Sequence, residues 1–566
     1  MKKFYLFLLA AINSMCAMAQ NEQVPQWLTA LVNENQGLID SVNWYNPHPA
    51  APYSRTYVVY YNQPLYHADP ASARFHMRAL ITVDTRNDVT KAVNHVYCSG
   101  YSIDYPSLVS PDSNFVNDKS SSAEIARRYN ANYIQIEHRY FQYSAPDECW
   151  TNLDPLTAEE AAADFHNLFN GLKKVLKGKW VMSGASKGGI TTLLQHAFYP
   201  EDMDVYVPYA APFFESEKDT TMYKYWYYNG WNKEYLDYFM SIRKKGIAGL
   251  FANPGTNTIW PIYYKMNSGG KTSQAAADTL AAVYMGCVAV FGFTAHAYTD
   301  TATLRKEMAL NDSVMRSYGW TQPNDTVMSF WLAKDTFSLK TFSAWIDTLR
   351  KYPDPAQVPA RRIEHRRIAP YGISEKAWWG ADTLHTGTAM AYEYQSKHEL
   401  GYYDVRFDDI CPNQQEAAAA NIFWQTYAGN CRDLGFPFKT VTFSRNLYDR
   451  TMEATKNATK PIILIYGEND AWTGAAVKDE FINGTNVQKF ILPAQNHYVS
   501  FSALTDPAKT AQITAVLDRV LGAPQGMDEV QQPAVQGTKV FRNGQLYIIR
   551  DGKTYNVLGA LINGTF

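Results

Sequence analysis

The segment Gly184-Ala185-Ser186-Lys187-Gly188 contains a serine between glycines in the pattern G-x-S-x-G. A strand-like run at 179–183 precedes it, and a helical pattern follows Gly189 as far as about Pro200. A sharp strand-to-helix turn strains the serine backbone and exposes its hydroxyl, and small flanking residues let neighbouring backbone approach closely. In this context we interpret Ser186 as a nucleophile; the alternative is a glycine-rich turn with an incidental serine.

A serine hydroxyl is a weak nucleophile at neutral pH, so it needs a base, and the base needs an orienting acid. Asp470 and His497 each come directly after a strand-like apolar run, at 462–466 and 487–492. The chain order serine, acid, histidine is that of hydrolases built around such a turn. The sequence therefore predicts a catalytic triad, with Glu468 as the alternative acid.

An oxyanion hole in such an enzyme uses the backbone N–H of the residue after the nucleophile, here Lys187, and one N–H from the third-strand loop. We assign that loop to 138–141 and the second donor to Tyr140. The alternative interpretation of Glu137 and Arg139 is a buried ion pair that holds this loop. Such an ion pair is compatible with a role of the loop in the oxyanion hole. The side chain of Lys187 is interpreted as a surface or cap contact rather than a catalyst.

The segments around these residues alternate between strand and helix. Apolar runs predict strands at 75–83, 93–99, 133–137 and 205–209. Thr157 and Glu160 form a capping box for a helix whose apolar residues continue at helical spacing to Leu176, and Gly178 closes it. Such alternation is typical of a mostly parallel sheet. Together with the serine turn it predicts an α/β fold of the α/β-hydrolase type.

The alternation stops near Pro212 and resumes near Pro461. The ~250 residues between them are too long for a loop, and their mixed, largely helical pattern predicts an inserted cap. The expected organisation is a signal peptide at 1–19, a hydrolase domain at 20–212 and 461–522, a mainly helical cap at 213–460, a linker at 523–537 and a C-terminal hairpin tail at 538–566.

The N-terminus has the features of a signal peptide. Lys2-Lys3 precede a short apolar run, Phe4–Ile12, and Ala17-Met18-Ala19 is a small-x-small cleavage site. The run is too short to span a bilayer, so we expect an exported protein, periplasmic or extracellular, without stable membrane insertion. Lipidation of Cys16 is the alternative to plain cleavage.

Charge and cysteine content exclude some classes of function. The chain of 566 residues has 52 basic and 54 acidic residues and no block of one sign, so we expect no nucleic-acid partner. After signal cleavage five cysteines remain, none in a C-x-x-C pair, so no metal and no other cofactor is expected. Cys411 and Cys431 either pair across a polar loop or remain separate buried thiols.

Four segments resemble the secreted serine peptidases typified by the mycelial tripeptidyl aminopeptidase of streptomycetes, and more distantly the lysosomal prolyl carboxypeptidase and dipeptidyl peptidase group. They are Tyr61-Asn62-Gln63-Pro64-Leu65, the 137–141 segment, the 178–189 segment with its continuation to Tyr209, and 398–403. Tyr66-His67 stands where the family has Asp-His, so any role of that aspartate is absent. The resemblance covers roughly 50–520, and the tail resembles short C-terminal hairpins on exported proteins of some Gram-negative bacteria.

The resemblance implies removal of short peptides, notably tripeptides, from free N-termini. An exopeptidase of this kind needs a carboxylate for the substrate ammonium, and the candidates are Glu399 and Glu137; either could instead be structural. The alternatives are a prolyl-specific peptidase or an esterase on the same scaffold, and a non-catalytic secreted binding protein. Peptides are the expected partners, and the sequence leaves the oligomeric state open.

Overall fold

The computed structural model describes residues 24–45, 54–103, 122–147, 152–228, 236–237, 388–404, 441–504 and 506–523, and in the tail 538–542, 545–550 and 553–556. The predicted signal peptide and linker, Cys411 and Cys431, and most of the predicted cap lie outside the described residues. The chain divides into two compact units, 1–521 and 522–566, and each is described by itself.

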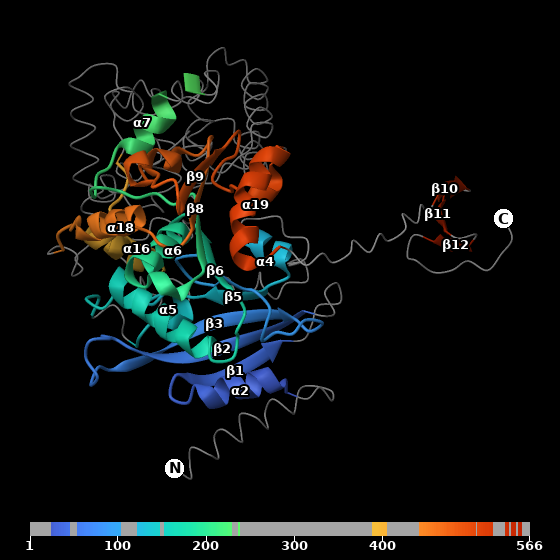
Figure 1. Cartoon of the computed structure of the whole chain (residues 1–566), viewed down its shortest axis with the longest axis horizontal. Coiled ribbons are helices and arrows are strands. Elements are labelled where there is room, and N and C mark those ends of the chain that lie inside the picture. Colours follow the sequence, from blue (N-terminus) through green and yellow to red (C-terminus); the bar gives the residue numbers. More distant parts are fainter. Residues whose placement is uncertain are drawn as a thin grey trace, which may run out of the picture. The chain divides into compact units, whose positions relative to one another are not determined.

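Nine strands form the sheet of the first unit, in the order β1-β2-β3-β5-β4-β6-β7-β8-β9 (Figure 1). Their bounds are β1 Ile39–Tyr45, β2 Ser54–Pro64, β3 Arg74–Asp84, β4 Asn94–Cys98, β5 Asn132–Ile136, β6 Trp180–Ala185, β7 Val205–Tyr209, β8 Ile462–Gly467 and β9 Val487–Leu492. β3 is antiparallel to both of its neighbours, and every pair from β5 to β9 is parallel. The predicted α/β-hydrolase type of sheet is confirmed.

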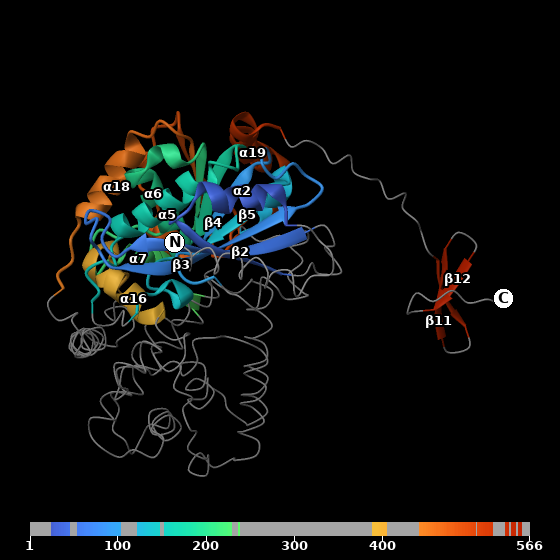
Figure 2. The same cartoon turned by 90° about the horizontal axis from the view of Figure 1, so that it is seen from below.

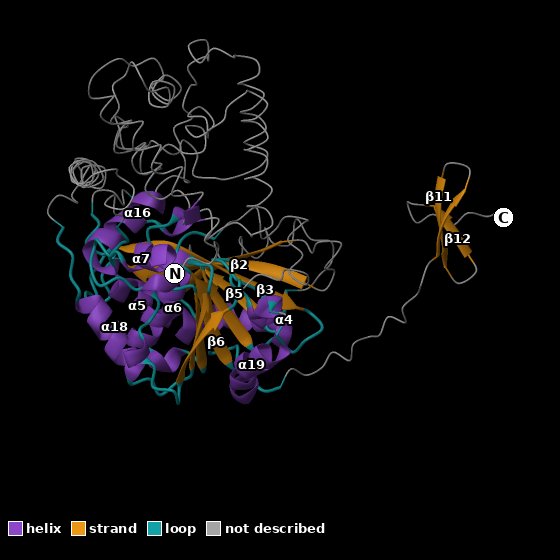
Figure 3. Ribbon diagram, turned by 90° about the horizontal axis from the view of Figure 1, so that it is seen from above, coloured by secondary structure: helices purple, strands orange, loops and turns teal. Residues whose placement is uncertain are grey.

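Helices cover both faces of the parallel part of this sheet. The helices α2 (Gln26–Glu34), α5 (Ala158–Leu172), α6 (Lys187–Phe198) and α18 (Asn446–Lys456) share one apolar core, and α4 (Glu124–Tyr129) and α19 (Pro507–Leu521) share another. Figures 1 and 3 show α5, α6 and α18 on one side of the strands and α4 and α19 on the other. Strands buried on both faces read as continuous apolar runs, which explains why β8 is apolar or glycine throughout.

The helix α5 begins as the capping box predicts. Thr157 Oγ1 accepts a hydrogen bond from the Glu160 N–H at 3.2 Å, and the apolar stripe from Ala161 to Leu172 is buried. The helix ends at Leu172 rather than at Gly178. The chain continues from there in hydrogen-bonded turns, with the Leu176 N–H donating to Leu172 O.

Of the predicted cap, the structure describes residues 213–228, 236–237, 388–404 and 441–460. These residues contain α7 (Thr221–Tyr228), α16 (Thr388–Gln395), the π-helical turn η5 (Ser396–Leu400) that follows α16 directly, and α18. Figure 2 shows α18, α6 and α5 along the same face of the sheet, and α18 also contacts η5. The bridge between Asp219 and Tyr403 joins the chain before α7 to the chain after η5.

The second unit contains β10 (Thr538–Arg542), β11 (Gln545–Arg550) and β12 (Lys553–Asn556), paired in antiparallel order. The residues between these strands, 543–544 and 551–552, lie outside the described residues. No helix in the described part of the chain is long and apolar enough to cross a membrane.

Candidate active site

Ser186 lies in the sharp turn between β6 and α6. Its backbone has φ 57° and ψ −123°, a conformation that costs a non-glycine residue of the order of 1–3 kcal/mol. The turn is held on both sides, since the Ser186 N–H donates to Tyr209 O at 2.9 Å and Ser186 O accepts from the Ile190 N–H at 3.0 Å. The strained strand-to-helix turn predicted from the glycine pattern is therefore present, and its side chain is half-buried.

The glycines of this turn are required by close approach to the end of β4. A Cβ atom on Gly184 would lie 2.4 Å from Cys98 O, and one on Gly188 would lie 2.0 Å from the same oxygen. Both distances are far below a van der Waals contact, and the oxygen that each Cβ atom would meet belongs to the backbone. Neither position therefore accommodates a side chain without a shift of the strand.

We expect Gly188→Ala to prevent normal folding, because its methyl group has no space between α6 and β4. The measurement is the yield of soluble protein and its Tm by calorimetry. Ile190→Val, a small cavity change at a buried position of the same helix, is the matched control and should cost only about 0.5–1.5 kcal/mol. A Gly188→Ala protein as stable as the control would contradict this close packing.

Asp470 and His497 meet at the ends of β8 and β9. Asp470 Oδ2 lies 2.7 Å from His497 Nδ1, and Asp470 Oδ1 accepts from the Trp472 N–H at 3.0 Å. The exposed fraction is 0% for Asp470 and 7% for His497. A carboxylate on Nδ1 requires the proton there, which leaves Nε2 as the basic nitrogen. The hydrogen bond between His497 and Ser186 stays a prediction.

Glu468, the alternative acid, has a different partner. Its Oε2 accepts from the Ala494 N–H at 2.9 Å and so holds the loop that precedes His497. The geometry therefore favours Asp470 as the residue that orients the histidine.

The loop beside the serine turn follows β4 and not β5. In the sheet β4 lies between β5 and β6, and a Cβ atom on Gly100 would lie 2.7 Å from both Gly188 N and Lys187 C. Tyr140, the predicted oxyanion donor, gives its N–H to Ser144 O at 2.8 Å. The geometry favours the loop after β4 as the source of the second donor, because the sheet reverses the chain order of β4 and β5. The overlooked signal is Ser99-Gly100-Tyr101, a glycine directly after a strand-like run.

The side chain of Lys187 points into the protein and is 2% exposed. Its Nζ donates to Gly100 O and lies 5.2 Å from the ring centre of Tyr101 and 4.9 Å from that of Phe141. Burial lowers the pKa of Lys187 to about 7. The predicted surface contact is therefore wrong, and the amine is a buried group that holds the loop after β4.

Glu137 is fully buried and takes part in an ion pair. Its Oε1 lies 2.6 Å from Arg78 Nη2 and accepts from the Ile103 N–H at 3.0 Å, and its Oε2 accepts from Ser144 Oγ at 2.9 Å. Burial raises the pKa of Glu137. With three donors and 0% exposure, this carboxylate matches the structural alternative and not the amine anchor.

Glu137→Gln should destabilise the fold, because Arg78 would remain buried with its charge uncompensated. Loss of one partner of a buried pair typically costs about 3–5 kcal/mol. Denaturant unfolding measures this change, and Arg78→Met together with Glu137→Gln should recover part of it. An unfolding free energy equal to that of wild type would contradict a structural ion pair.

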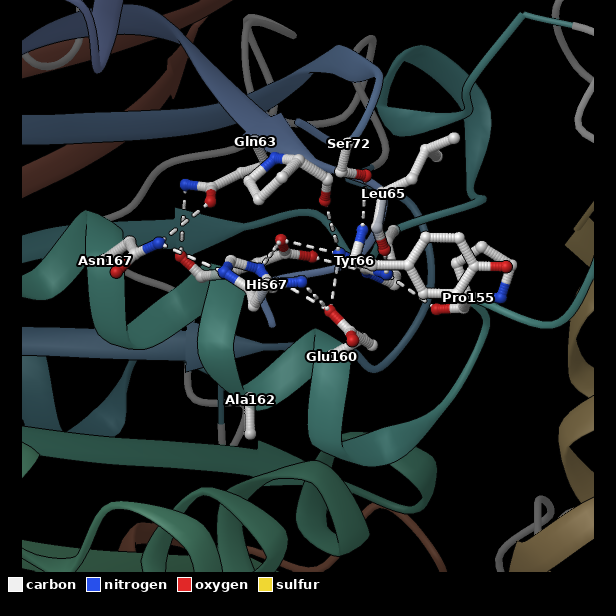
Figure 4. A network of polar contacts seen from close by, with 12 residues as sticks. Gln63, Leu65, Tyr66, His67, Ser72, Pro155, Glu160, Ala162 and Asn167 are labelled. Carbon is white, nitrogen blue, oxygen red and sulfur yellow. Dashed lines mark hydrogen bonds and ion pairs between the residues drawn. The ribbon is translucent and has the colours of Figure 1, made fainter. Parts of the chain in front are cut away.

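Arg139 anchors a second buried network, drawn in Figure 4 around His67. Arg139 Nε and Nη2 donate to Asp164 at 2.6 and 2.9 Å, and Asp164 Oδ1 also lies 2.8 Å from His67 Nε2. The His67 N–H donates to Glu160 at 2.9 Å. His67, in the segment that differs from the family, therefore ties the β2–β3 connection to α5.

Glu399, the other candidate anchor, lies in η5 and is 9% exposed. Its Oε1 accepts from the Ala158 N–H, the first residue of α5, at 2.7 Å. Burial raises the pKa of Glu399 to about 8, and the nearby Lys187 opposes that shift. Glu399 Oε1 thus caps the N-terminus of α5. The Glu399 carboxyl group lies on the same side of the site as the buried Lys187 side chain.

A series of aromatic contacts connects the histidine loop to the loop after β4. Each neighbouring pair of rings has its centres 4.5–6.1 Å apart. In order the residues are His497, Trp472, Tyr403, Tyr402, Tyr392, Tyr101 and Phe141. These contacts place the described cap residues 392 and 402–403 beside both loops.

Residues 38–250 match the family described as PS-10 peptidase S37. The chain is 23% identical over 495 residues to the prolyl tri/tetrapeptidyl aminopeptidase of Streptomyces mobaraensis, covering 85% of this chain and 83% of the relative. Similar solved structures include the peroxisomal α/β-hydrolase Lpx1 of Saccharomyces cerevisiae (10% identity, TM-score 0.32, 82% of this chain and 88% of that one). Another is the proline iminopeptidase of Mycobacterium smegmatis (12% identity, TM-score 0.27, 79% and 94%).

The sequence match over residues 38–250 includes the serine turn, and the match to the aminopeptidase extends over most of the chain. The predicted resemblance is confirmed, and this chain is a serine-type peptidase whose residues 38–250 match the PS-10 peptidase S37 family.

Proposed function

We propose that this peptidase works through an acyl-enzyme in which Ser186 attacks the scissile carbonyl, His497 takes and returns the proton, and Asp470 orients the histidine. The observation that carries the proposal is the strained Ser186 turn together with the 2.7 Å contact between Asp470 and His497. Strain at a backbone position persists where surrounding structure enforces it, and it clusters at active sites. The acid and base come from loops after adjacent strands of the same sheet.

The oxyanion hole is assigned to the N–H groups of Lys187 and Tyr101. Lys187 follows the nucleophile, and Tyr101 lies in the loop that contacts the serine turn through Gly100. The Tyr101 N–H donates to Ser99 Oγ at 3.1 Å. A negatively charged substrate oxygen is a stronger acceptor than a neutral hydroxyl, so it would replace or share this bond.

The proposed substrates are peptides with a free N-terminus, from which tripeptides are released. The similarity to a tri/tetrapeptidyl aminopeptidase supports this assignment. Glu399 remains the candidate for binding the substrate ammonium, because the carboxylate of Glu137 is occupied by three donors. The N-terminal pattern supports export, with a mature chain that begins after Ala19.

Proline before the scissile bond is the second candidate specificity. The aromatic series around His497 and Tyr101 offers flat apolar surfaces that suit a pyrrolidine ring, and the related aminopeptidase is named prolyl.

The deciding experiment uses a peptide library in free and N-acetylated form, with mass spectrometry of the products. The proposal expects tripeptides from the free peptides only, and a preference for proline at the third position supports the second candidate. Equal cleavage of both forms rules out the exopeptidase. Cleavage of esters but not peptides would identify an esterase, and N-terminal sequencing of the exported protein tests the cleavage site.

A further inference from the structure

The amine of Lys187 donates to the carbonyl of Gly100. That carbonyl belongs to the same peptide unit as the Tyr101 N–H, so its orientation sets the direction of the N–H. In a trans peptide the C=O and N–H point to opposite sides of a rigid plane. A cation on the carbonyl oxygen also polarises the unit and strengthens the N–H as a donor.

Two aromatic rings hold the amine in this position. Lys187 Nζ lies over the rings of Tyr101 and Phe141, and a cation at such distances is attracted to the ring faces. The Tyr101 ring packs on Phe141 with centres 5.7 Å apart. The Lys187 amine thus acts on Tyr101 in two ways. It binds the Gly100 carbonyl, which shares a peptide unit with the Tyr101 N–H, and it contacts the Tyr101 ring.

We propose that the Lys187 side chain is a positioning residue that aligns and polarises the Gly100–Tyr101 peptide unit, so that one residue secures both donors of the oxyanion hole. Its own N–H supplies the first donor and its amine orients the second. The inference rests on the proposed function, since an oxyanion hole matters only in a hydrolase that works through Ser186.

The charged and titratable groups that act on Lys187 come from three elements. They are Cys98 of β4, Glu399 of η5 and His138 after β5. A small cavity with room for about one water molecule is lined by Lys187, His138 and Gln395 among others. Burial lowers the pKa of Lys187 to about 7, and Glu399 opposes that shift. Lys187 is therefore a cation on the acid side of neutrality, and it loses its charge as the pH rises.

The test compares Lys187→Met with wild type on a chromogenic tripeptide. Methionine keeps most of the buried volume but removes the donor and the charge. We expect kcat to fall by about tenfold or more, less than the effect of removing a whole oxyanion donor, and KM to change by less than about twofold. Replacing a buried cation by an apolar side chain is often neutral or stabilising, so Tm should not fall.

Lys173→Met is the matched control. Lys173 also donates to a backbone carbonyl, that of Asp202, and lies 5.6 Å from the Trp180 ring centre. It lies at the opposite end of the strands, since Trp180 begins β6 while Ser186 follows its end. We expect Lys173→Met to retain the kcat of wild type.

The pH profile separates positioning from simple structural support. In wild type, kcat should decline as the pH rises through about 7, because neutral Lys187 polarises the peptide unit less. Lys187→Met should lack this alkaline limb. The pKa of Glu399 is about 8, above the value of about 7 for Lys187, so the Glu399 carboxyl group is largely neutral while Lys187 is charged. Glu399→Gln should therefore leave the limb in place, equally for free and N-acetylated peptides. An amine anchor at Glu399 would instead raise KM for free peptides alone.

A Lys187→Met enzyme with wild-type kcat and pH profile would overturn the inference. So would a loss of kcat that Lys173→Met shares, or a fall in Tm that accounts for the lost activity. Labelling of wild-type Ser186 by a fluorophosphonate checks the underlying function separately. A wild-type enzyme that neither reacts with this probe nor cleaves peptides contradicts the proposed function itself.

Discussion

Ser186→Ala is expected to lower kcat by at least about 10³-fold, because the acyl-enzyme can no longer form. The strained turn should persist, since the backbone hydrogen bonds to Tyr209 and Ile190 do not use the side chain. Hydrolysis of a chromogenic tripeptide measures the loss, and Tm together with far-UV circular dichroism shows that the fold is intact.

A second substitution tests whether the serine and the histidine act as one unit. His497→Ala in the Ser186→Ala background should cause little further loss, because groups that act together are strongly non-additive. Additive losses would show that Ser186 and His497 do not act as one unit. A Ser186→Ala protein that keeps more than a tenth of wild-type activity would show that another residue is the nucleophile.

Asp470→Asn is expected to lower kcat by about 10⁴-fold while the fold remains intact. An amide can retain the acceptor for the Trp472 N–H, but its NH₂ group offers Nδ1 a proton and so favours the histidine tautomer that lacks a free base at Nε2. Kinetics over a range of pH measure the effect.

Glu468→Gln is the matched control for this experiment. The amide oxygen of glutamine can still accept from the Ala494 N–H, so kcat should stay within about threefold of wild type. If Glu468→Gln abolished activity and Asp470→Asn did not, Glu468 and not Asp470 would be the acid that orients His497.

The serine turn and its acid and base were predictable because each rests on local signals. The glycines at 184 and 188 are required by contact with Cys98 O, and such a requirement is visible in sequence as a residue pattern. Asp470 and His497 could be found because each directly follows a strand. Residues immediately after parallel strands meet at one edge of a sheet, whatever lies between them in the chain.

The second oxyanion loop could not be assigned by counting strands along the chain. The sheet places β4 next to β6 and moves β5 one position outward, and this exchange depends on tertiary packing. The burial of Lys187 was missed for a related reason. Lysine is rarely buried, and only the carbonyl of Gly100 and the rings around it make this position acceptable.

The pairing of β7 with β8 has a consequence for the timing of activity during synthesis. Tyr206 pairs with Ile462, so the strand that carries Asp470 joins the sheet across an insertion of more than 200 residues. Closing so long a segment is entropically costly and slow relative to local folding. A nascent chain would therefore present Ser186 long before the ribosome has produced its acid and base. The intervening sequence therefore separates synthesis of the nucleophile from synthesis of its acid and base.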